Sequence, residues 1–413
     1  MTTTFVIGAG VAGLAAATRL AEAGRKVTLI EAAPQAGGRC RSYFDSQLGQ
    51  IIDNGNHLVL SGNHAIMRYL ARLGATDALQ GPDKAGIACV DIRNGFRWAI
   101  TPNDGPLPSW IFCPRRRVPD TRAMDYTELA KLFLPQGNRK LGDVLGCDGV
   151  LWERLLHPFF LGALNTEPAT ASASLASKLV RETFAKGGAA YRCLIAHPSL
   201  AAAFVDPALM FLAGRNATLR LGQRVRKLVF ERNTVSGVVL ADGQLPVLAG
   251  DMVVLAVPPW SAQELVPGLE TPDAFRAIVN AHFKRPGPKD APLMLGVVGG
   301  TAQWIFCFAN RISVTISDAD AIVNQDREKL AQTIWADVVK ALSISEPLPP
   351  WQIVKEKRAT FAATPEQAAR RPPARTRWTN LLLAGDWTDT HLPATLEGAI
   401  RSGHTAAELA LRT

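Results

Sequence analysis

The N-terminal 31 residues set the strongest constraint on how this chain can fold. Residues 4–8, TFVIG, form an apolar run that predicts a buried strand, and the turn Gly8-Ala9-Gly10-Val11-Ala12-Gly13 follows directly. The sequence LAAATRLAEAG then predicts a helix closed by Gly24. A second strand at 26–30 ends in Glu31. A strand, a glycine-rich turn, a helix and an acid-terminated strand, in this order, are typical of a dinucleotide-binding α/β unit.

Each glycine of this turn has a separate physical role. Gly8 permits the sharp turn, Gly10 lets the backbone approach a pyrophosphate, and Gly13 lets helix and strand pack closely. The start of the helix offers free N–H groups and the positive end of its dipole. The carboxylate of Glu31 is positioned to accept hydrogen bonds from both ribose hydroxyls, and it disfavours the 2′-phosphate of NADP. The residues predicted to bind the nucleotide here are Gly8, Gly10, Ala12, Gly13, Glu31 and Ala32.

A short motif just downstream distinguishes FAD from NAD. Gly37-Gly38-Arg39 resembles the extension found in flavoproteins of the amine oxidase and phytoene desaturase type. That resemblance implies that Gly38 and Arg39 lie along the pyrophosphate and the flavin, where Arg39 neutralises phosphate charge. The cofactor is therefore expected to be FAD.

The C-terminal region supports a flavin. An apolar run at 381–384 ends in Gly385 and Asp386, and a helix is predicted to begin near Thr395 and Leu396. In the resembling flavoproteins the glycine passes close to the pyrophosphate, the aspartate bonds the ribityl chain or phosphate, and the helix N-terminus stabilises negative charge on the reduced ring. Two glycines inside that helix, at 398 and 403, predict close packing. The motif contains no cysteine, so non-covalent binding is expected.

A β-meander is predicted between these two motifs. Strands are expected at 224–230 and 235–240, with a turn at 241–243 and a return strand within 251–259. The resemblance implies that the backbone of Val225 pairs with adenine. Glycines also follow an apolar run at 296–300, but their spacing does not fit a second nucleotide site, so no NAD(P)H site is expected.

These elements predict an α/β fold in which a Rossmann-like FAD-binding domain, a parallel sheet plus a β-meander, is interleaved with an α+β substrate domain. The FAD-binding domain would comprise residues 1–57, 216–260 and 376–413, and the substrate domain residues 58–215 and 261–375. Within the latter, residues 151–166 place large apolar side chains around polar ones. This pattern suits a helix lining a cavity for a long hydrocarbon, and packed core is the alternative.

Composition limits the partners. The 413-residue chain has a net charge of +9, and arginines cluster at 115–117 and again at 370, 371, 375 and 377. Such clusters are either solvated loop faces or contacts with an anionic lipid surface, and no recognised nucleic-acid module accompanies them. The six cysteines have neither CxxC nor metal-ligand spacing, which predicts reduced thiols and no metal site. No apolar stretch of about 20 residues is present. A cytoplasmic location is expected, with peripheral contact at the inner face of the membrane left open.

Several motifs resemble the hydroxysqualene dehydroxylase family of FAD-dependent enzymes in bacterial hopanoid biosynthesis. They are residues 53–60 (DNGNHLVL), 164–168 (LNTEP), 383–388 (LAGDWT) and 392–399 (LPATLEGA). The resemblance implies that Gly55 and Asn56 lie at the flavin, although glutamine would be expected at 56. Residues 80–140 match poorly. The implied reaction removes the allylic hydroxyl of hydroxysqualene reductively to give squalene. The implied partners are a long-chain isoprenoid substrate and an external flavin reductant.

This reaction needs an acid, because hydroxide is a poor leaving group. The candidates that the motifs place near the flavin are His57, Asp389 and His391. In the alternative interpretation His57 only positions the flavin, Asp53 caps the turn at Asn54 and Gly55, and Asp389 caps the following loop.

Three other functions fit parts of the pattern. A carotenoid or phytoene-type desaturase would use the same fold on an oily substrate and transfer hydride in the opposite direction. An amine oxidase usually binds a polar amine between paired aromatic rings, for which Trp387 is the only nearby candidate. A flavin-bound protein without enzymatic activity would keep Glu31 and Gly385 yet show no turnover.

Overall fold

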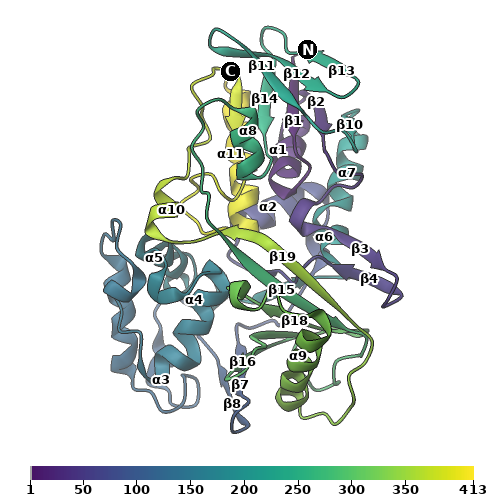
Figure 1. The fold of residues 1–413 in the computed structure, drawn as a ribbon. Helices are drawn as coiled ribbons and strands as arrows, with labels where there is room; N and C mark the ends of the chain where they lie inside the picture. The colour runs from purple at the N-terminus through teal and green to yellow at the C-terminus, as the bar shows by residue number, and fades with distance from the viewer. Residues whose placement is uncertain (1) are drawn as a thin grey trace.

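A five-stranded parallel sheet forms the upper part of the computed structural model, which describes residues 2–413 (Figure 1). Its strands, in spatial order, are β10 (Thr218–Arg220), β2 (Lys26–Ile30), β1 (Thr3–Ile7), β14 (Met252–Leu255) and β20 (Leu381–Leu383). Every neighbouring pair is parallel. This is the 3-2-1-4-5 order of a doubly wound nucleotide-binding sheet, so the predicted fold class is confirmed.

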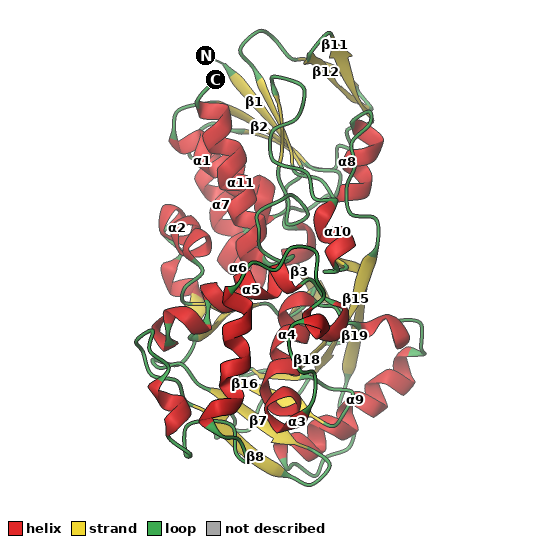
Figure 2. Ribbon diagram, turned by 90° about the vertical axis from the view of Figure 1, so that its left-hand side faces the viewer, coloured by secondary structure: helices red, strands yellow, loops and turns green. Residues whose placement is uncertain are grey.

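Two helices from opposite ends of the chain pack against each other beside this sheet. Helix α1 (Val11–Glu22) lies beside α11 (Leu396–Leu411) and α7 (Asp206–Ala213) (Figure 2). The alanines of α1 are buried. A Cβ atom at Gly403 would lie 2.1 Å from the carbonyl oxygen of Ala12, and one at Gly13 would lie 1.9 Å from that of Gly8. The close packing predicted for Gly13 and Gly403 is therefore present.

Helix α11 also holds a third helix. The buried carboxylate of Glu397 accepts hydrogen bonds from the backbone N–H groups of Ala65 and Ile66, at 3.0 to 3.1 Å. These amides belong to the first turn of α2 (His64–Leu73), whose own N-terminal residue provides no side-chain cap. A carboxylate at a helix N-terminus satisfies unpaired donors and complements the dipole, so α2 is anchored from the C-terminal helix.

The β-meander forms a small separate sheet. Strands β11 (Lys227–Glu231), β12 (Thr234–Leu240) and β13 (Gly243–Pro246) pair antiparallel in sequence order. The predicted first strand began three residues too early, because residues 224–226 precede the paired region. Sequence analysis also missed β13, a short, mostly exposed edge strand with little apolar signal.

A seven-stranded sheet forms the lower part of the molecule. Its order is β19 (Trp351–Phe361), β15 (Phe275–Phe283), β18 (Ile312–Ile316), β17 (Trp304–Cys307), β16 (Met294–Val298), β7 (Ile87–Asp91) and β8 (Phe96–Ile100). Helix α9 (Arg327–Leu342) covers one face, where Val279, Val314 and Ile305 meet Ile334 and Trp335 in one apolar cluster. Alternate residues on the same strands point to the opposite face.

The remaining elements complete the lower body and the junction. Helices α3 (Gly149–Leu151) and α4 (His157–Leu164) are joined by a π-helical turn, Trp152–Leu156, and α5 (Ala173–Glu182) follows. The smaller elements are β3 (Ser42–Asp45), β4 (Gln50–Asp53), β5 (Leu58–Leu60), β6 (Leu79–Gln80), β9 (Cys193–Ala196), α6 (Leu200–Phe204), α8 (Pro259–Leu265) and α10 (Pro365–Ala369). The parallel and seven-stranded sheets draw on the residue ranges assigned to the two domains, and the exact boundaries stay a prediction.

The C-terminal arginine cluster is only partly exposed, because Arg375 and Arg377 face solvent whereas Arg371 does not. Arg371 is buried, and its guanidinium donates to the carbonyl oxygens of Asp386 (3.1 Å) and Thr388 (2.5 Å). Arg370 pairs with Asp273 at 2.6 Å, and Arg377 lies over the ring of Trp378. The expectation of a solvated or lipid-facing run is wrong for Arg371, because three carbonyl and hydroxyl acceptors, including Thr390, draw it inward.

Two searches of the described residues are relevant to partners. No helix within residues 2–413 is long and apolar enough to cross a bilayer. No group of three or more His, Cys, Asp or Glu side chains in the same range is arranged to hold a metal ion. All six cysteines are free thiols, of which Cys40, Cys89 and Cys193 are buried.

Gly403→Ala should lower the stability of the protein. Alanine gains about 1 kcal/mol over glycine in a helix interior, but overpacking against a backbone atom costs about 1–3 kcal/mol. At 2.1 Å the contact with the Ala12 oxygen lies at the costly end, so the denaturant midpoint should fall. Gly86→Ala, where the added Cβ has only one neighbour, at 3.7 Å, is the control. A midpoint for Gly403→Ala at or above wild type would contradict this packing.

Candidate active site

The glycine turn leaves room for a phosphate group. Gly8 has φ +104°, and a Cβ there would meet the carbonyl oxygen of Ala256 at 2.4 Å, whereas a Cβ at Gly10 would meet nothing within 4 Å. The first-turn amides of α1, including those of Ala12 and Gly13, have no intrahelical partners. Open space above a helix N-terminus is a favourable place for a pyrophosphate.

Glu31 is fixed at the edge of this turn. Its carboxylate accepts hydrogen bonds from the backbone N–H groups of Ala9 (2.7 Å) and Ala33 (2.8 Å), with Ala32 between Glu31 and the second donor. Each carboxylate oxygen can accept further hydrogen bonds, so both remain available to hydroxyl donors. The geometry fits the ribose role predicted for this residue.

Arg39 connects three distant parts of the chain. The preceding Gly37 donates its N–H to Ala9 at 2.8 Å, which lays residues 37–39 along the glycine turn. The Arg39 guanidinium pairs with Asp386 at 2.6 Å and also donates to the carbonyl oxygen of Ala359 on β19. Both predicted flavin motifs therefore meet at this ion pair, beside a strand of the lower sheet.

The loop after Gly385 is shaped by an indole. Gly385 has φ +149°, and a Cβ there would lie 2.4 Å from Trp387 Nε1. That nitrogen donates to the carbonyl oxygen of Val257 at 2.9 Å, and Trp387 is only 2% exposed. Trp387 is therefore a core residue and presents no free ring face. Helix α11 begins at Leu396 as predicted, with Thr395 as its N-cap accepting from the Gly398 N–H at 3.1 Å.

Asp53 anchors the loop 53–57 from below. Its carboxylate pairs with Arg311 at 2.9 Å and accepts from the Ser42 hydroxyl (2.6 Å) and the Leu200 N–H (2.9 Å). Arg311 and Asp53 are both almost fully buried. The interpretation that Asp53 caps the turn at Asn54 and Gly55 is wrong, because its oxygens bond to other elements.

Asn56 belongs to a polar group on the lower sheet. Its amide nitrogen donates to Thr315 Oγ1 at 3.1 Å, and that hydroxyl donates to Asn280 Oδ1 at 2.7 Å. A Cβ at Gly55 would lie 2.9 Å from the Asn280 amide, which accounts for glycine at 55. Asn56 Oδ1 is buried without a partner among residues 2–413. A buried acceptor of this kind is expected to meet a donor when the site is complete, as an N–H of a flavin or a substrate hydroxyl would provide.

The three predicted acids do not form one group. His57 lies beside Arg39, and burial together with this positive charge lowers the pKa of His57 to about 4, so its ring is neutral at neutral pH. Asp389 and His391 pair with each other at 3.1 Å, with side chains 42% and 78% exposed. Val225 lies half-buried between β10 and β11. The catalytic role of His57, Asp389 and His391 and the adenine contact of Val225 stay predictions.

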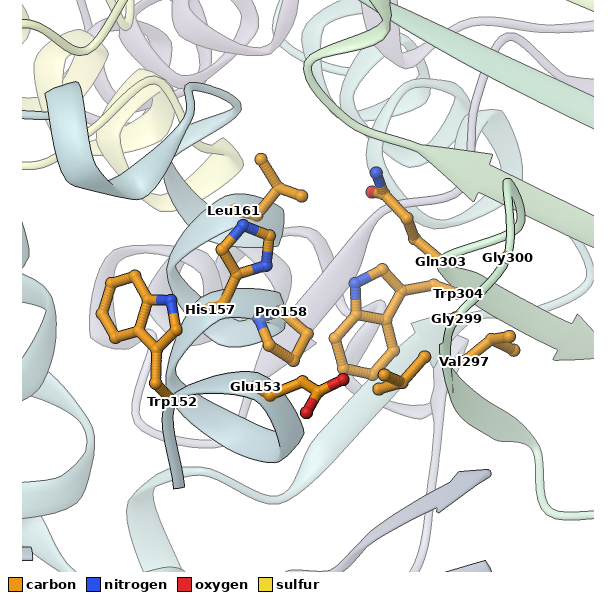
Figure 3. Close-up of a pocket in the computed structure, with 11 residues that line it drawn as sticks. Trp152, Glu153, His157, Pro158, Leu161, Val297, Gly299, Gly300, Gln303 and Trp304 are labelled. Carbon is orange, nitrogen blue, oxygen red and sulfur yellow. The ribbon is translucent and has the colours of Figure 1, made fainter. Parts of the chain in front are cut away.

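A cavity of about 380 Å³ opens between α4 and the lower sheet (Figure 3). One wall comes from α4 and the preceding π-helical turn, the other from β16, β17 and the loop between them. This agrees with the interpretation of residues 151–166 as a cavity-lining helix. The lining residues are Trp152, Glu153, His157, Pro158, Leu161, Val297, Val298, Gly299, Gly300, Gln303 and Trp304.

Strand register places the cavity next to the polar group. Asn280 pairs with Thr315, Thr315 with Trp304, and Trp304 with Gly296. Directly paired residues point to the same face, and neighbouring strands lie about 4.8 Å apart. Trp304 in the cavity wall is therefore one strand away from the hydroxyl that Asn56 contacts. Along this face of the sheet, the polar side chains of Asn280 and Thr315 are followed by the aromatic side chain of Trp304.

The comparisons with known proteins agree with this arrangement. The family described as flavin containing amine oxidoreductase matches residues 11–411. A hydroxysqualene dehydroxylase from Rhodopseudomonas palustris is 50% identical over 99% of this chain and 98% of its own length. One from Zymomonas mobilis is 47% identical over 100% and 99%. The chain belongs to the hydroxysqualene dehydroxylase family of flavin containing amine oxidoreductases.

Solved structures agree on the fold. Cyclohexylamine oxidase from Brevibacterium oxydans superimposes with a TM-score of 0.70 over 100% of this chain and 99% of its own. At 15% identity this likeness concerns the fold alone. The family match covers both flavin motifs, which agrees with a flavin cofactor.

Several residues of the site had no clear signal in the sequence. Arg311 is 258 residues from Asp53, and nothing in its local pattern marks a partner. Asn280 and Thr315 are polar residues inside strands, a pattern that also describes a solvated sheet face. Trp304 follows the glycines of 296–300, which sequence analysis considered only as a nucleotide motif.

The Asp53–Arg311 pair should contribute strongly to stability where β3, β4 and α6 meet the lower sheet. Arg311→Met leaves a buried carboxylate without its partner, which typically costs about 3–5 kcal/mol. Adding Asp53→Asn should recover part of this loss, because the uncompensated charge is gone. Guanidinium unfolding of both variants measures the difference.

The control is Arg285→Met, which removes a pair with Glu346 whose side chains are 19% and 45% exposed, and which should change the midpoint far less. Equal losses for Arg311→Met and Arg285→Met would contradict a special role for the buried pair.

Proposed function

We propose that this protein binds FAD non-covalently and removes the allylic hydroxyl of hydroxysqualene reductively, giving squalene in hopanoid biosynthesis. The observation that supports this best is the meeting of both flavin motifs at the Arg39–Asp386 pair, beside a sheet face that leads from a polar group into an apolar cavity. The two relatives at 47–50% identity are named for this activity.

The choice of FAD follows from the residues at both ends of the site. Glu31 is placed for the ribose of an adenosine, and the open space at Gly10 and the N-terminus of α1 suits a pyrophosphate. Helix α11, which begins at Leu396 after the Gly385-Asp386 motif, supplies a positive dipole end at its N-terminus. Residues 381–403 contain no cysteine for a thioether link, so a dissociable cofactor is expected.

The chain's own residues would bind and orient the substrate and would keep water away from the reacting carbon. Trp152, Trp304 and Leu161 form apolar walls that exclude water, and the two indole faces can stabilise positive charge on an allylic carbon. Hydrogen bonds to the polar end of a substrate or cofactor are available from the side-chain amides of Asn56 and Asn280 and the hydroxyl of Thr315. When bound and reduced by an external donor, FAD supplies the hydride. An acid must protonate the leaving hydroxyl.

The rival functions are less well supported. A carotenoid or phytoene-type desaturase shares the fold and an apolar cavity, and only the direction of hydride transfer separates it. An amine oxidase needs aromatic rings facing the flavin, whereas the predicted candidate Trp387 is buried and bonded to Val257. A flavin-bound protein without activity would have no need of the 380 Å³ cavity.

Peripheral contact with an anionic membrane, on the inner face in the cytoplasm, is a further part of the proposal. Leu107, Phe112, Met124 and Leu134 are 62–79% exposed, and they alternate with basic residues such as Arg115. The segment also adjoins the cavity helix, because Arg154 pairs with Asp120 at 2.8 Å. Exposed apolar side chains among basic ones fit a lipid surface, where each basic residue contributes about 1 kcal/mol.

Anaerobic incubation of photoreduced, FAD-loaded protein with hydroxysqualene tests the activity. We expect squalene to form in amounts matching the flavin and the flavin to become oxidised, since hydride leaves the reduced cofactor. Product analysis by mass spectrometry and the flavin absorbance report the two events. Flavin that stays reduced would contradict the proposal. Separately, new conjugated double bonds formed from a polyene such as phytoene by the oxidised holoprotein would favour a desaturase.

Sedimentation with vesicles tests the membrane contact. Phe112→Ser combined with Leu134→Ser should reduce binding to vesicles containing anionic lipid, because the inserted apolar area is lost. Met210→Ser, at a residue 75% exposed on α7, is the matched control and should bind like wild type. Equal binding of all three proteins, or equal binding to zwitterionic vesicles, would rule out this surface as an anionic membrane contact.

A further inference from the structure

His157 is a titratable side chain in the wall of the cavity. It is the first residue of α4, it is partly exposed at 35%, and its Nε2 lies 3.4 Å from the Glu167 carboxylate. Trp152, another wall residue, packs edge-on against the imidazole with ring centroids 5.9 Å apart. In Figure 3 the imidazole and the Trp304 indole project into the cavity from opposite walls.

Local backbone structure brings His157 and Glu167 together. The π-helical turn at Trp152–Leu156 precedes His157, and such turns redirect side chains at functional sites. After α4 the chain reverses at Asn165, which has φ +47° and whose side chain bonds the Asp318 N–H (2.7 Å) and the Thr360 hydroxyl (2.9 Å). The turn at Asn165, fixed by these two hydrogen bonds, brings Glu167 back toward His157. The LNTEP stretch thus has a structural purpose that the flavin motifs do not explain.

The other polar side chains of the cavity are already engaged. Glu153 pairs with Arg93 at 2.6 Å. The Gln303 amide exchanges two hydrogen bonds with the Ser317 backbone, at 2.8 and 3.1 Å. Among the lining residues that the structure describes, His157 therefore is the one whose ring can both hold a proton and release it into the cavity.

Glu167 connects this imidazole to solvent and to further carboxyl groups. Its side chain is 49% exposed. Nearby Asp318 forms a pair with Arg276 at 3.3 Å. Burial raises the pKa of Asp318, although Arg276 opposes this effect, and the charges of Asp320 and Glu167 add to it. The half-exposed carboxylate of Glu167 can pass a proton from bulk water to the imidazole after each reaction.

We propose that His157 is the catalytic acid of the reaction described under the proposed function, and that Glu167 is its positioning residue. Since Nε2 faces Glu167, the other ring nitrogen, Nδ1, is the donor to the substrate. As the allylic C–O bond breaks, its electron pair stays on oxygen, which takes the Nδ1 proton and leaves as water. Bound and reduced FAD would supply the hydride that the carbon takes up, and the imidazole regains a proton from solvent through Glu167.

Single-turnover reduction of hydroxysqualene by photoreduced holoprotein tests this assignment. His157→Gln should slow squalene formation by about 10²–10⁴-fold, the usual contribution of a general acid, with flavin content unchanged. Added imidazole should restore part of the rate. Glu167→Gln should cause a smaller loss. His64→Gln, at an exposed histidine that begins α2, is the matched control and should react like wild type.

An ester of hydroxysqualene provides a readout that a structural role would not move. Its carboxylate leaves without needing a proton, so His157→Gln and wild type should reduce this ester at similar rates. Equal slowing of alcohol and ester would mean that His157 only shapes the cavity, and the proposal would fall. It would also fall if His157→Gln stayed within threefold of wild type while His57→Gln lost the rate and kept its flavin.

The experiment also distinguishes a folding defect from failure of the proposed function and from failure of the His157 assignment. If His157→Gln does not fold, judged by circular dichroism and flavin content, His157→Asn replaces it, and the same ester comparison decides. If wild type forms no squalene from the alcohol, the proposed function fails. If wild type forms squalene and His157→Gln does so equally fast, only the assignment of His157 fails.

Discussion

The buried ion pair between Asp53 and Arg311 is the interaction on which the site depends. It joins the end of β4, which leads into the loop 53–57, to the start of β18 in the lower sheet. The same carboxylate holds Ser42 and the first turn of α6. Four elements therefore meet at one charged group with almost no access to water. Because an unpaired charge there would be costly, the loop has one favourable position, and Asn56 is presented to the sheet in a fixed way.

Close backbone contact gives the upper body its geometry. Gly13 and Gly403 let α1 approach both its own strand and α11, so that the two helices starting at the nucleotide turn and at Thr395 lie side by side. Each helix begins shortly after a flavin motif, α1 after the glycine turn and α11 after Gly385 and Asp386. Two positive dipole ends near one site favour a ligand with negative charge at more than one point, as a dinucleotide has.

Local sequence predicted the upper body well because its signals are local. The glycine turn, the strand ending in Glu31 and the helix starting after Thr395 each depend on residues a few positions apart, and each is found where expected. The lower body depends on pairings across more than 100 residues, such as Asp53 with Arg311. Register decides which strand residues share a face, and sequence pattern does not reveal register between distant strands. The buried position of Arg371 was missed for a different reason: its acceptors lie on a loop 15 to 19 residues away, and nothing in the local pattern shows that the loop folds back on it.

A cross-strand row in the lower sheet runs through Asn280, Thr315, Trp304 and Gly296 and fixes the spacing between these four residues. Each step along it is one strand spacing of about 4.8 Å, and each position is set by backbone hydrogen bonds rather than by flexible side chains. At the far end, the Trp304 ring extends over Gly296, where a Cβ would come within 3.2 Å of the ring. The separation between Asn280 in the polar group and Trp304 in the cavity wall is therefore two strand spacings. A side chain at Gly296 would press on Cys89 and on the Trp304 ring, so the position of this wall indole depends on a glycine one strand away.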